Sequence, residues 1–186
     1  MTLANNFEAY KNEIELIKVQ NPVEIELYSI IASIFRERKN GTNISLRDVS
    51  ARQPSKKSKS FMSESGFPDF VILSKNFRMV EPDEGKFEGQ ILGAIEAKSI
   101  LEKSLDFRKD SKLLKQFNDH IEKFKKVIYT NGLEWRFYQY DESEKEEKLE
   151  WQVKLGEWNK NEIKWDAIEN NAWNDLLDKL EKIVWI

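Results

Sequence analysis

The chain has 186 residues, of which 34% are charged, and its formal net charge is −3. This length suits one compact domain spanning residues 1–186. The absence of cysteine excludes disulfides and thiolate metal sites. No apolar run is long enough to span a bilayer and charges interrupt the first twenty residues, so we expect a cytoplasmic protein without membrane contact.

The first third of the chain favours helices followed by a loop. A weak helical pattern covers residues 5–19, and a stronger one covers 21–40, with Asn21 as expected N-cap and Pro22 at the first helical position. The polar, serine-rich and basic stretch 41–66 is predicted to be a long loop.

The middle of the chain alternates between extended and helical patterns. We expect strands at 68–74, 77–81 and 87–100, with a turn at 82–85 between the last two. Apolar residues then recur on one face of a predicted helix over 109–124, namely Leu113, Phe117, Ile121 and Phe124.

The last third is predicted to begin with a hairpin. Strands at 126–130 and 133–140 flank Asn131-Gly132, a strong hairpin signal, and Trp135 is the aromatic residue we most expect in the core. The acidic run 141–150 is interpreted as a loop, 151–158 as a strand and 171–186 as a closing helix. This order predicts an α/β fold with a central mixed sheet flanked by helices.

Two charged residues interrupt the apolar strand "ILGAIEAKSI" at 91–100. Glu96 and Lys98 lie two positions apart and therefore share one face of the strand, which suggests a wet site on that face. If the chain folds back about 82–85 with a constant register, Asp69 lies opposite Lys98 and diagonal to Glu96. Opposed side chains lie about 5 Å apart and diagonal ones about 7–8 Å apart. A bulge near 74–76 would shift this register.

Two carboxylates at such a separation can hold one hard cation. Mg²⁺ is bound by one or two carboxylates and keeps several waters. Asp69, Glu96 and the backbone carbonyl of Ala97 are the candidate ligands, and Mn²⁺ is expected to substitute. Lys98 is expected to orient a water or to offset charge that develops on a phosphoryl group.

The same residues carry a resemblance to a known family. "FPDFVIL" followed by "AIEAK" resembles the PD-(D/E)XK nuclease superfamily, in which Pro-Asp precedes Glu-X-Lys on paired strands. The stretch "QFNDHIEKFKKVIYTNGLEWRFY" is similar to nuclease domains of type I restriction enzymes and fused restriction–methylation proteins. Gln116 matches the Gln of their Gln-X-X-X-Tyr helix, whereas His120 stands where the Tyr would be. The resemblance covers about residues 20–140 and leaves 141–186 as a C-terminal strand and helix extension.

This resemblance implies a restriction-endonuclease-like core and a Mg²⁺-dependent endodeoxyribonuclease that hydrolyses DNA phosphodiester bonds in restriction or phage defence. It places Asp69, Glu96, Lys98 and Gln116 in the active site. It also implies that a helix acid, Glu26 or Glu24, completes the metal site, although a solvated helix acid explains either residue equally well. Because one active site cuts one strand, cleavage of both strands implies a homodimer or a larger restriction complex.

Contacts with DNA phosphates are expected from two basic segments. The first is the loop before the Pro-Asp strand and the second is a ridge on the 109–124 helix that also carries Gln116, and a simple solvated loop is an equal alternative for the former. The candidate residues are Lys56, Lys57, Lys59, Lys112, His120 and Lys123.

Other functions remain open at this point. Glu96 and Lys98 would form an ordinary surface ion pair if their strand lay at an edge. A catalytically silent nucleic-acid-binding or assembly module of the same fold is one alternative function. A protein–protein interaction domain with an incidental charged strand is another.

Overall fold

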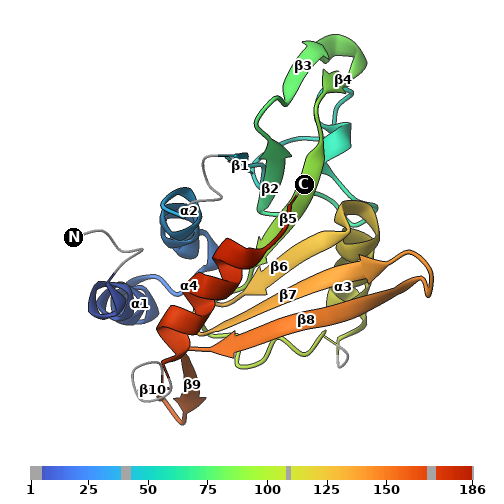
Figure 1. Ribbon diagram of the computed structural model, residues 1–186. Coiled ribbons are helices and arrows are strands. Elements are labelled where there is room, and N and C mark those ends of the chain that lie inside the picture. The colour runs from blue at the N-terminus through green and yellow to red at the C-terminus, as the bar shows by residue number, and fades with distance from the viewer. Residues whose placement is uncertain (1–5, 39–42, 108–109, 167–170, 186) are drawn as a thin grey trace.

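A computed structural model describes residues 6–38, 43–107, 110–166 and 171–185 and shows a mixed α/β architecture. Its centre is a six-stranded sheet in the order β1-β2-β5-β6-β7-β8, with helices on both faces (Figure 1). The sheet strands are β1 (Ile44–Asp48), β2 (Phe70–Ser74), β5 (Ile91–Ala97), β6 (Lys126–Thr130), β7 (Glu134–Asp141) and β8 (Glu146–Lys154). The α-helices are α1 (Phe7–Gln20), α2 (Tyr28–Arg36), α3 (Ser111–Phe124) and α4 (Ala172–Lys182).

The start of the second helix differs from the prediction. Asn21 caps the C-terminus of α1, where its N–H donates to the carbonyl of Ile17, and it is not the N-cap of α2. A 3₁₀ turn, η2 (Glu24–Leu27), comes before α2. The expected helix over 21–40 is therefore shorter and begins later than the apolar pattern indicated.

The predicted loop over 41–66 contains a strand and a 3₁₀ turn. β1 pairs antiparallel with β2, and Leu46 lies opposite Ile72. The short turn η4 (Lys59–Phe61) follows. β1 escaped prediction because it is a short edge strand, in which only Leu46 is buried.

The hairpin register also differs from the prediction. β3 (Arg78–Glu81) and β4 (Lys86–Glu88), joined by the turn η5 (Pro82–Glu84), form a separate two-stranded arm that projects from the sheet (Figure 1). Irregularities between Met79 and Glu81 and between Ile72 and Leu73 shift the pairing. Phe70 lies opposite Ile95, so continued pairing sets Asp69 opposite Glu96, two residues from the predicted partner.

The C-terminal half builds the other side of the sheet. α3 connects β5 to β6, which run parallel, and the β6–β7 hairpin turns at Asn131-Gly132 as predicted. The acidic run 141–150 was predicted as a loop, and residues 142–145 do form the turn between β7 and β8, but 146–150 supply the first half of β8. A second pair of strands, β9 (Gly156–Asn159) and β10 (Glu162–Trp165), precedes α4.

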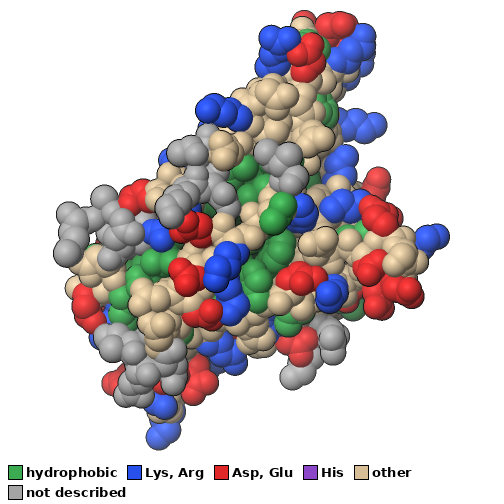
Figure 2. Space-filling model, viewed as in Figure 1, with side chains coloured by type: hydrophobic (Ala, Val, Ile, Leu, Met, Phe, Trp, Pro, Cys, Tyr) green, Lys and Arg blue, Asp and Glu red, His purple; other side chains and the backbone are tan. Residues whose placement is uncertain are grey.

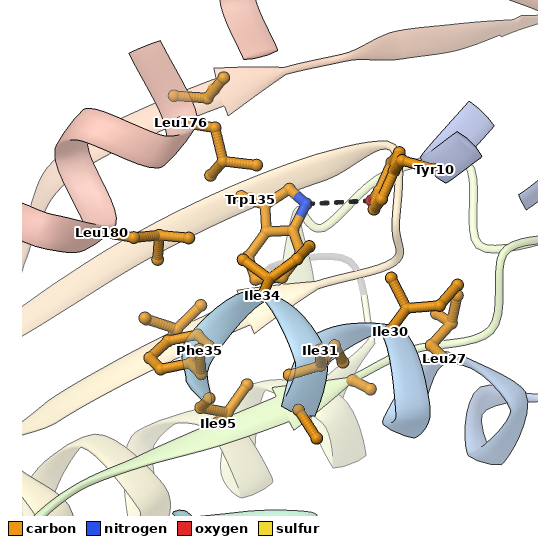
Figure 3. Close-up of a cluster of buried hydrophobic side chains, with 14 of the residues drawn as sticks. Tyr10, Leu27, Ile30, Ile31, Ile34, Phe35, Ile95, Trp135, Leu176 and Leu180 are labelled. Atoms are coloured by element: carbon orange, nitrogen blue, oxygen red, sulfur yellow. Dashed lines mark hydrogen bonds between the residues drawn. The ribbon is translucent and has the colours of Figure 1, made fainter. Parts of the chain in front are cut away.

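Two hydrophobic cores cover the two faces of the sheet. The first core lies between the sheet and α1, α2 and α4, and Figure 3 shows its centre, where Trp135 Nε1 donates to Tyr10 Oη at 3.4 Å. As predicted, Trp135 is a core residue, with no exposed surface. The second core lies between the sheet and α3 and includes Val71, Ala94, Phe117, Ile121 and Tyr129. Glu96 occupies this second face, so the expected wet face of β5 is in fact covered by a helix.

Within the described ranges, no helix combines the length and apolar character needed to cross a membrane.

Candidate active site

Two carboxylates meet where β2 begins and β5 ends. Asp69 comes immediately before β2, and Glu96 is the penultimate residue of β5. Their antiparallel pairing brings them together because Phe70 lies opposite Ile95. Both are buried, with 7% of Asp69 and 4% of Glu96 exposed. Removing two like charges from water in this way is costly unless a cation or a proton balances them.

Hydrogen bonds hold Asp69 in one orientation. The hydroxyl of Tyr28, at the start of α2, donates to Oδ1. The backbone N–H of Ala97 donates to Oδ2 at 2.6 Å. Tyr28 packs edge-on against Phe70, with ring centroids 5.1 Å apart, which fixes the hydroxyl in turn. Tyr28 was not among the predicted site residues, because only the tertiary fold brings α2 to the start of β2.

Lys98 lies between Glu96 and helix α3. Its Nζ is 2.7 Å from Glu96 Oε1 and 3.1 Å from Gln116 Oε1, and 12% of its side chain is exposed. The structure thus brings Gln116 to the predicted charged pair. The alternative of an exposed ion pair on an edge strand is wrong, since β5 is central in the sheet.

His120 lies inside the molecule and does not contribute to a basic surface. Its side chain has no exposed surface, and Nδ1 is 3.6 Å from Glu96 Oε2. Burial lowers the pKa of His120 to about 4, so the imidazole is neutral at physiological pH. The prediction that His120 contacts DNA is wrong, because its neutral ring lies buried between α3 and the sheet and cannot reach a phosphate.

One oxygen of Glu96 remains without a hydrogen bond. Oε1 accepts from Lys98, whereas the buried Oε2 has no hydrogen-bond partner in the described part of the chain. Burial first, and then the charge of Asp69, raise the pKa of Glu96, while Lys98 opposes the rise. Burial likewise raises the pKa of Asp69. An added positive charge, from a cation or a proton, therefore stabilises the Asp69–Glu96 pair.

The two candidate helix acids differ in their relation to this pair. The charge of Glu24, an exposed residue of η2, contributes to the raised pKa values of Asp69 and Glu96. Glu26 instead accepts a hydrogen bond from Asn21 Nδ2 at 2.7 Å. Glu24 is thus the acid that acts on the site, yet the described residues contain no group of three or more His, Asp or Glu side chains placed to hold a metal ion.

A divalent cation fits this donor set as a site with few protein ligands. Mg²⁺ accepts one or two carboxylates and fills its other positions with water. The two buried carboxylates meet that requirement, because Asp69 is oriented and Oε2 of Glu96 has no hydrogen-bond partner within the described ranges. The N–H of Ala97 points toward β2, where it donates to Asp69, and a strand residue directs its N–H and C=O to the same side. The Ala97 carbonyl therefore also points toward the β2 side of β5.

The predicted DNA-binding lysines do not form one basic surface. Lys57 is 2.7 Å from Asp83 and Lys56 is 3.5 Å from Glu84, so both pair with acids of η5. Figure 2 shows both charge signs gathered at the tip of the β3–β4 arm.

A groove of about 940 Å³ beside α3 contains three of these lysines together with a larger number of acids. The lysines are Lys56, Lys59 and Lys123, and the acids are Glu64, Glu84, Asp119 and Glu122. Lys112 lies exposed in the first turn of α3 and does not line this groove. A net acidic lining is a poor match for a phosphate backbone.

Comparisons with known proteins identify no relative, since no protein-family model, curated protein or solved structure matches the chain.

Proposed function

We propose that the protein is a Mg²⁺-dependent endodeoxyribonuclease with a restriction-endonuclease-like core, which hydrolyses phosphodiester bonds of DNA. The observation that supports this most is the pair of buried carboxylates, in which Asp69 is held in one orientation and Oε2 of Glu96 has no hydrogen-bond partner among the described residues. Two buried carboxylates whose pKa values are raised, next to a lysine, form an arrangement that often marks a functional site.

Each residue of the site has a role in this proposal. Asp69 and Glu96, with the Ala97 carbonyl, would hold the cation, which when bound polarises a phosphoryl oxygen and acidifies a bound water. Lys98 would stabilise charge that builds on the phosphoryl group. Gln116 positions Lys98 by accepting its hydrogen bond, and Tyr28 positions Asp69.

The burial of the site supports a second candidate, a catalytically silent nucleic-acid-binding or assembly module of the same fold. Little of Asp69, Glu96 or Lys98 is exposed, and each carboxylate already has at least one hydrogen bond. In this alternative the polar cluster specifies how α3 sits on the sheet and performs no chemistry.

Plasmid cleavage distinguishes the two candidates. We expect Mg²⁺ to support cleavage of supercoiled DNA and EDTA to abolish it. Lys98→Ala should lower the cleavage rate by about a hundredfold or more, because a donor to the transition state is lost. DNA binding in EDTA should be unchanged in this variant.

The matched control is Lys148→Ala, which removes an exposed lysine of β8 at the far edge of the sheet. Because Lys98→Ala leaves Glu96 buried without its cation, Lys98→Gln serves as a second variant, and circular dichroism checks the fold of each. Equal cleavage by wild type and both Lys98 variants would refute the proposed mechanism. Absence of cleavage by the wild type, with DNA binding intact, would favour the silent module.

A further inference from the structure

A second groove, of about 400 Å³, lies between β1, the segment 52–61, the end of β2 and the start of the arm. It differs from the groove beside α3 in its charge, because five cationic side chains and no acidic side chain line it. These cationic residues are Arg47, Arg52, Lys57, Lys75 and Arg78.

Three of the five cations are not neutralised by an acid. Arg78 pairs with Glu88 at 2.5 Å and Lys57 with Asp83 at 2.7 Å. The other three cations are Arg47, Arg52 and Lys75. None of them forms an ion pair with a carboxylate in the part of the chain that the structure describes. All three are exposed.

Both arginines are held at the groove by contacts that leave their charge in place. The guanidinium of Arg52 lies over the ring of Phe61, 4.6 Å from its centroid. Arg47 Nη1 donates to the carbonyl of Leu46 at 2.9 Å. A planar guanidinium fixed in this way keeps further N–H groups for a phosphate, which it binds in a fork geometry.

We propose that this groove, through Arg47, Arg52 and Lys75, is the principal contact for the phosphate backbone of duplex DNA. The predicted loop lysines Lys56, Lys57 and Lys59 are not the principal contact in this proposal. The proposed function supplies only the identity of the polyanion as DNA. The excess of arginine and lysine without acids supplies the attraction, which for nucleic acids comes largely from neutralised phosphates.

The groove is placed to act on the same DNA as the carboxylate site. Leu46 of β1 and its partner Ile72 face the first core. Because neighbouring strand residues point to opposite faces, Arg47 and its partner Val71 lie on the face of the second core. Glu96 lies on that same face of the sheet.

The distance between this groove and the carboxylate site can be compared with the spacing of phosphates along duplex DNA. Ser74, in the groove lining, is five residues from Asp69 along β2, which is about 17 Å at about 3.4 Å per residue. Each DNA strand presents one phosphate per about 3.4 Å of helix axis, so a duplex lying along β2 would advance about five base pairs between the two positions.

A salt titration of DNA binding tests this assignment. The affinity of a labelled 20-base-pair duplex is measured in EDTA, so that no cleavage is needed, for the variant Arg47→Ala/Arg52→Ala/Lys75→Ala. The slope of log affinity against log salt should become shallower by up to about 2.7 units, since each neutralised phosphate contributes about 0.9. The charge-conserving variant Arg47→Lys/Arg52→Lys should keep the slope within one unit of wild type.

The matched control is the variant Lys148→Ala/Lys154→Ala/Lys164→Ala, which changes the net charge by the same amount. Lys148 and Lys154 lie in β8, at the opposite edge of the sheet from β1, and Lys164 lies in β10. A slope that changes only in the groove variant supports the inference. Equal changes in both triple variants, or none in either, would overturn it. A change seen with inorganic polyphosphate but not with duplex DNA would overturn the assignment to DNA. If the wild type fails to cleave DNA yet the groove variant alone loses salt dependence, the nuclease proposal fails while the groove assignment stands.

Discussion

Glu96 has two oxygens with opposite surroundings. One accepts a hydrogen bond from Lys98 at 2.7 Å, and the other faces the neutral imidazole of His120 at 3.6 Å without a hydrogen bond. A buried carboxylate in this position is more stable protonated than charged, which is the cause of its raised pKa. The pH dependence of stability should therefore reveal it.

The first prediction concerns Glu96→Gln. The pKa of Glu96 in the folded protein lies above its value of about 4.3 in the unfolded chain. Protonated Glu96 therefore contributes fully to the free energy of unfolding below pH 4.3, and this contribution is lost as pH rises through the raised pKa. The variant cannot ionise, so it should gain stability relative to wild type between pH 5 and pH 9, by about 1.4 kcal/mol for each unit by which the pKa is raised. Urea unfolding at pH 5, 7 and 9 measures the difference. A difference that does not change with pH would show that Glu96 is not perturbed.

Most residues of the carboxylate site were predicted from the sequence. The positions of His120 and Tyr28 beside it were not, for two different reasons. Strand alternation grouped Glu96 with Lys98, because it is a local property, whereas Asp69 was added through a proposed hairpin register and Gln116 through the family resemblance. The burial of His120 was also predictable, since it lies three residues after Phe117 and four before Phe124, within the apolar stripe of α3. Tyr28 was not, because nothing local connects α2 to Asp69.

At the scale of elements, the strands that sequence reasoning missed are those at the edges of the sheet. β1 and most of β8 lack apolar alternation because little of either is buried. The buried parts of central strands β2 and β5 were predicted, since both faces of each are buried and their apolar runs are continuous. The single strand predicted over 87–100 is wrong, because it divides into β4 of the arm and β5 of the central sheet. The predicted partner of Asp69 was wrong because the pairing shifts by two residues where the arm joins the sheet, between Arg78, opposite Glu88, and Leu73, opposite Ile91. A shift of two residues preserves the face but changes the opposing residue.

Gly93 in β5 gives a prediction at this scale. A Cβ on this residue would lie 2.5 Å from the carbonyl oxygen of Lys126 and 2.6 Å from the ring of Trp185. We expect Gly93→Ala to lower the free energy of unfolding by about 1–3 kcal/mol, because overpacking forces neighbouring groups apart.

A double-mutant cycle with Trp185→Ala provides the control. Since the small side chain at position 185 relieves part of the clash, the loss in the double variant should be smaller than the sum of the single losses, by about 0.5–3 kcal/mol. Strictly additive losses would mean that Trp185 does not press on β5.

At the scale of the whole molecule, the sheet is covered by three helices on one face and by one on the other. Glu96 lies on the face that α3 covers. The single helix carries both Gln116 and His120 against the pair, so its placement and the geometry of the site depend on each other.

The described part of the chain holds one such carboxylate pair, which gives a prediction about the order of DNA products. If the proposed function holds, a single site cuts one strand at a time, so nicked circles should precede linear DNA in a plasmid time course. Raising protein concentration should shorten the lag between nicked and linear forms if two copies act together. Gel electrophoresis of time points follows both. Linear product that forms at once at the lowest protein concentration would contradict one site per strand.

The acidic run that forms the first half of β8 has a consequence for how copies of the chain meet. β8 is the last strand of the sheet, so one row of its backbone N–H and C=O groups faces away from β7. An open edge of nine residues would ordinarily invite another chain to add a strand. Glu146, Glu147 and Glu150 are exposed along this strand, and a second copy added in parallel and in register would set carboxylates against carboxylates. These exposed acids thus protect against aggregation through this edge, and a switch of all three to glutamine removes that protection.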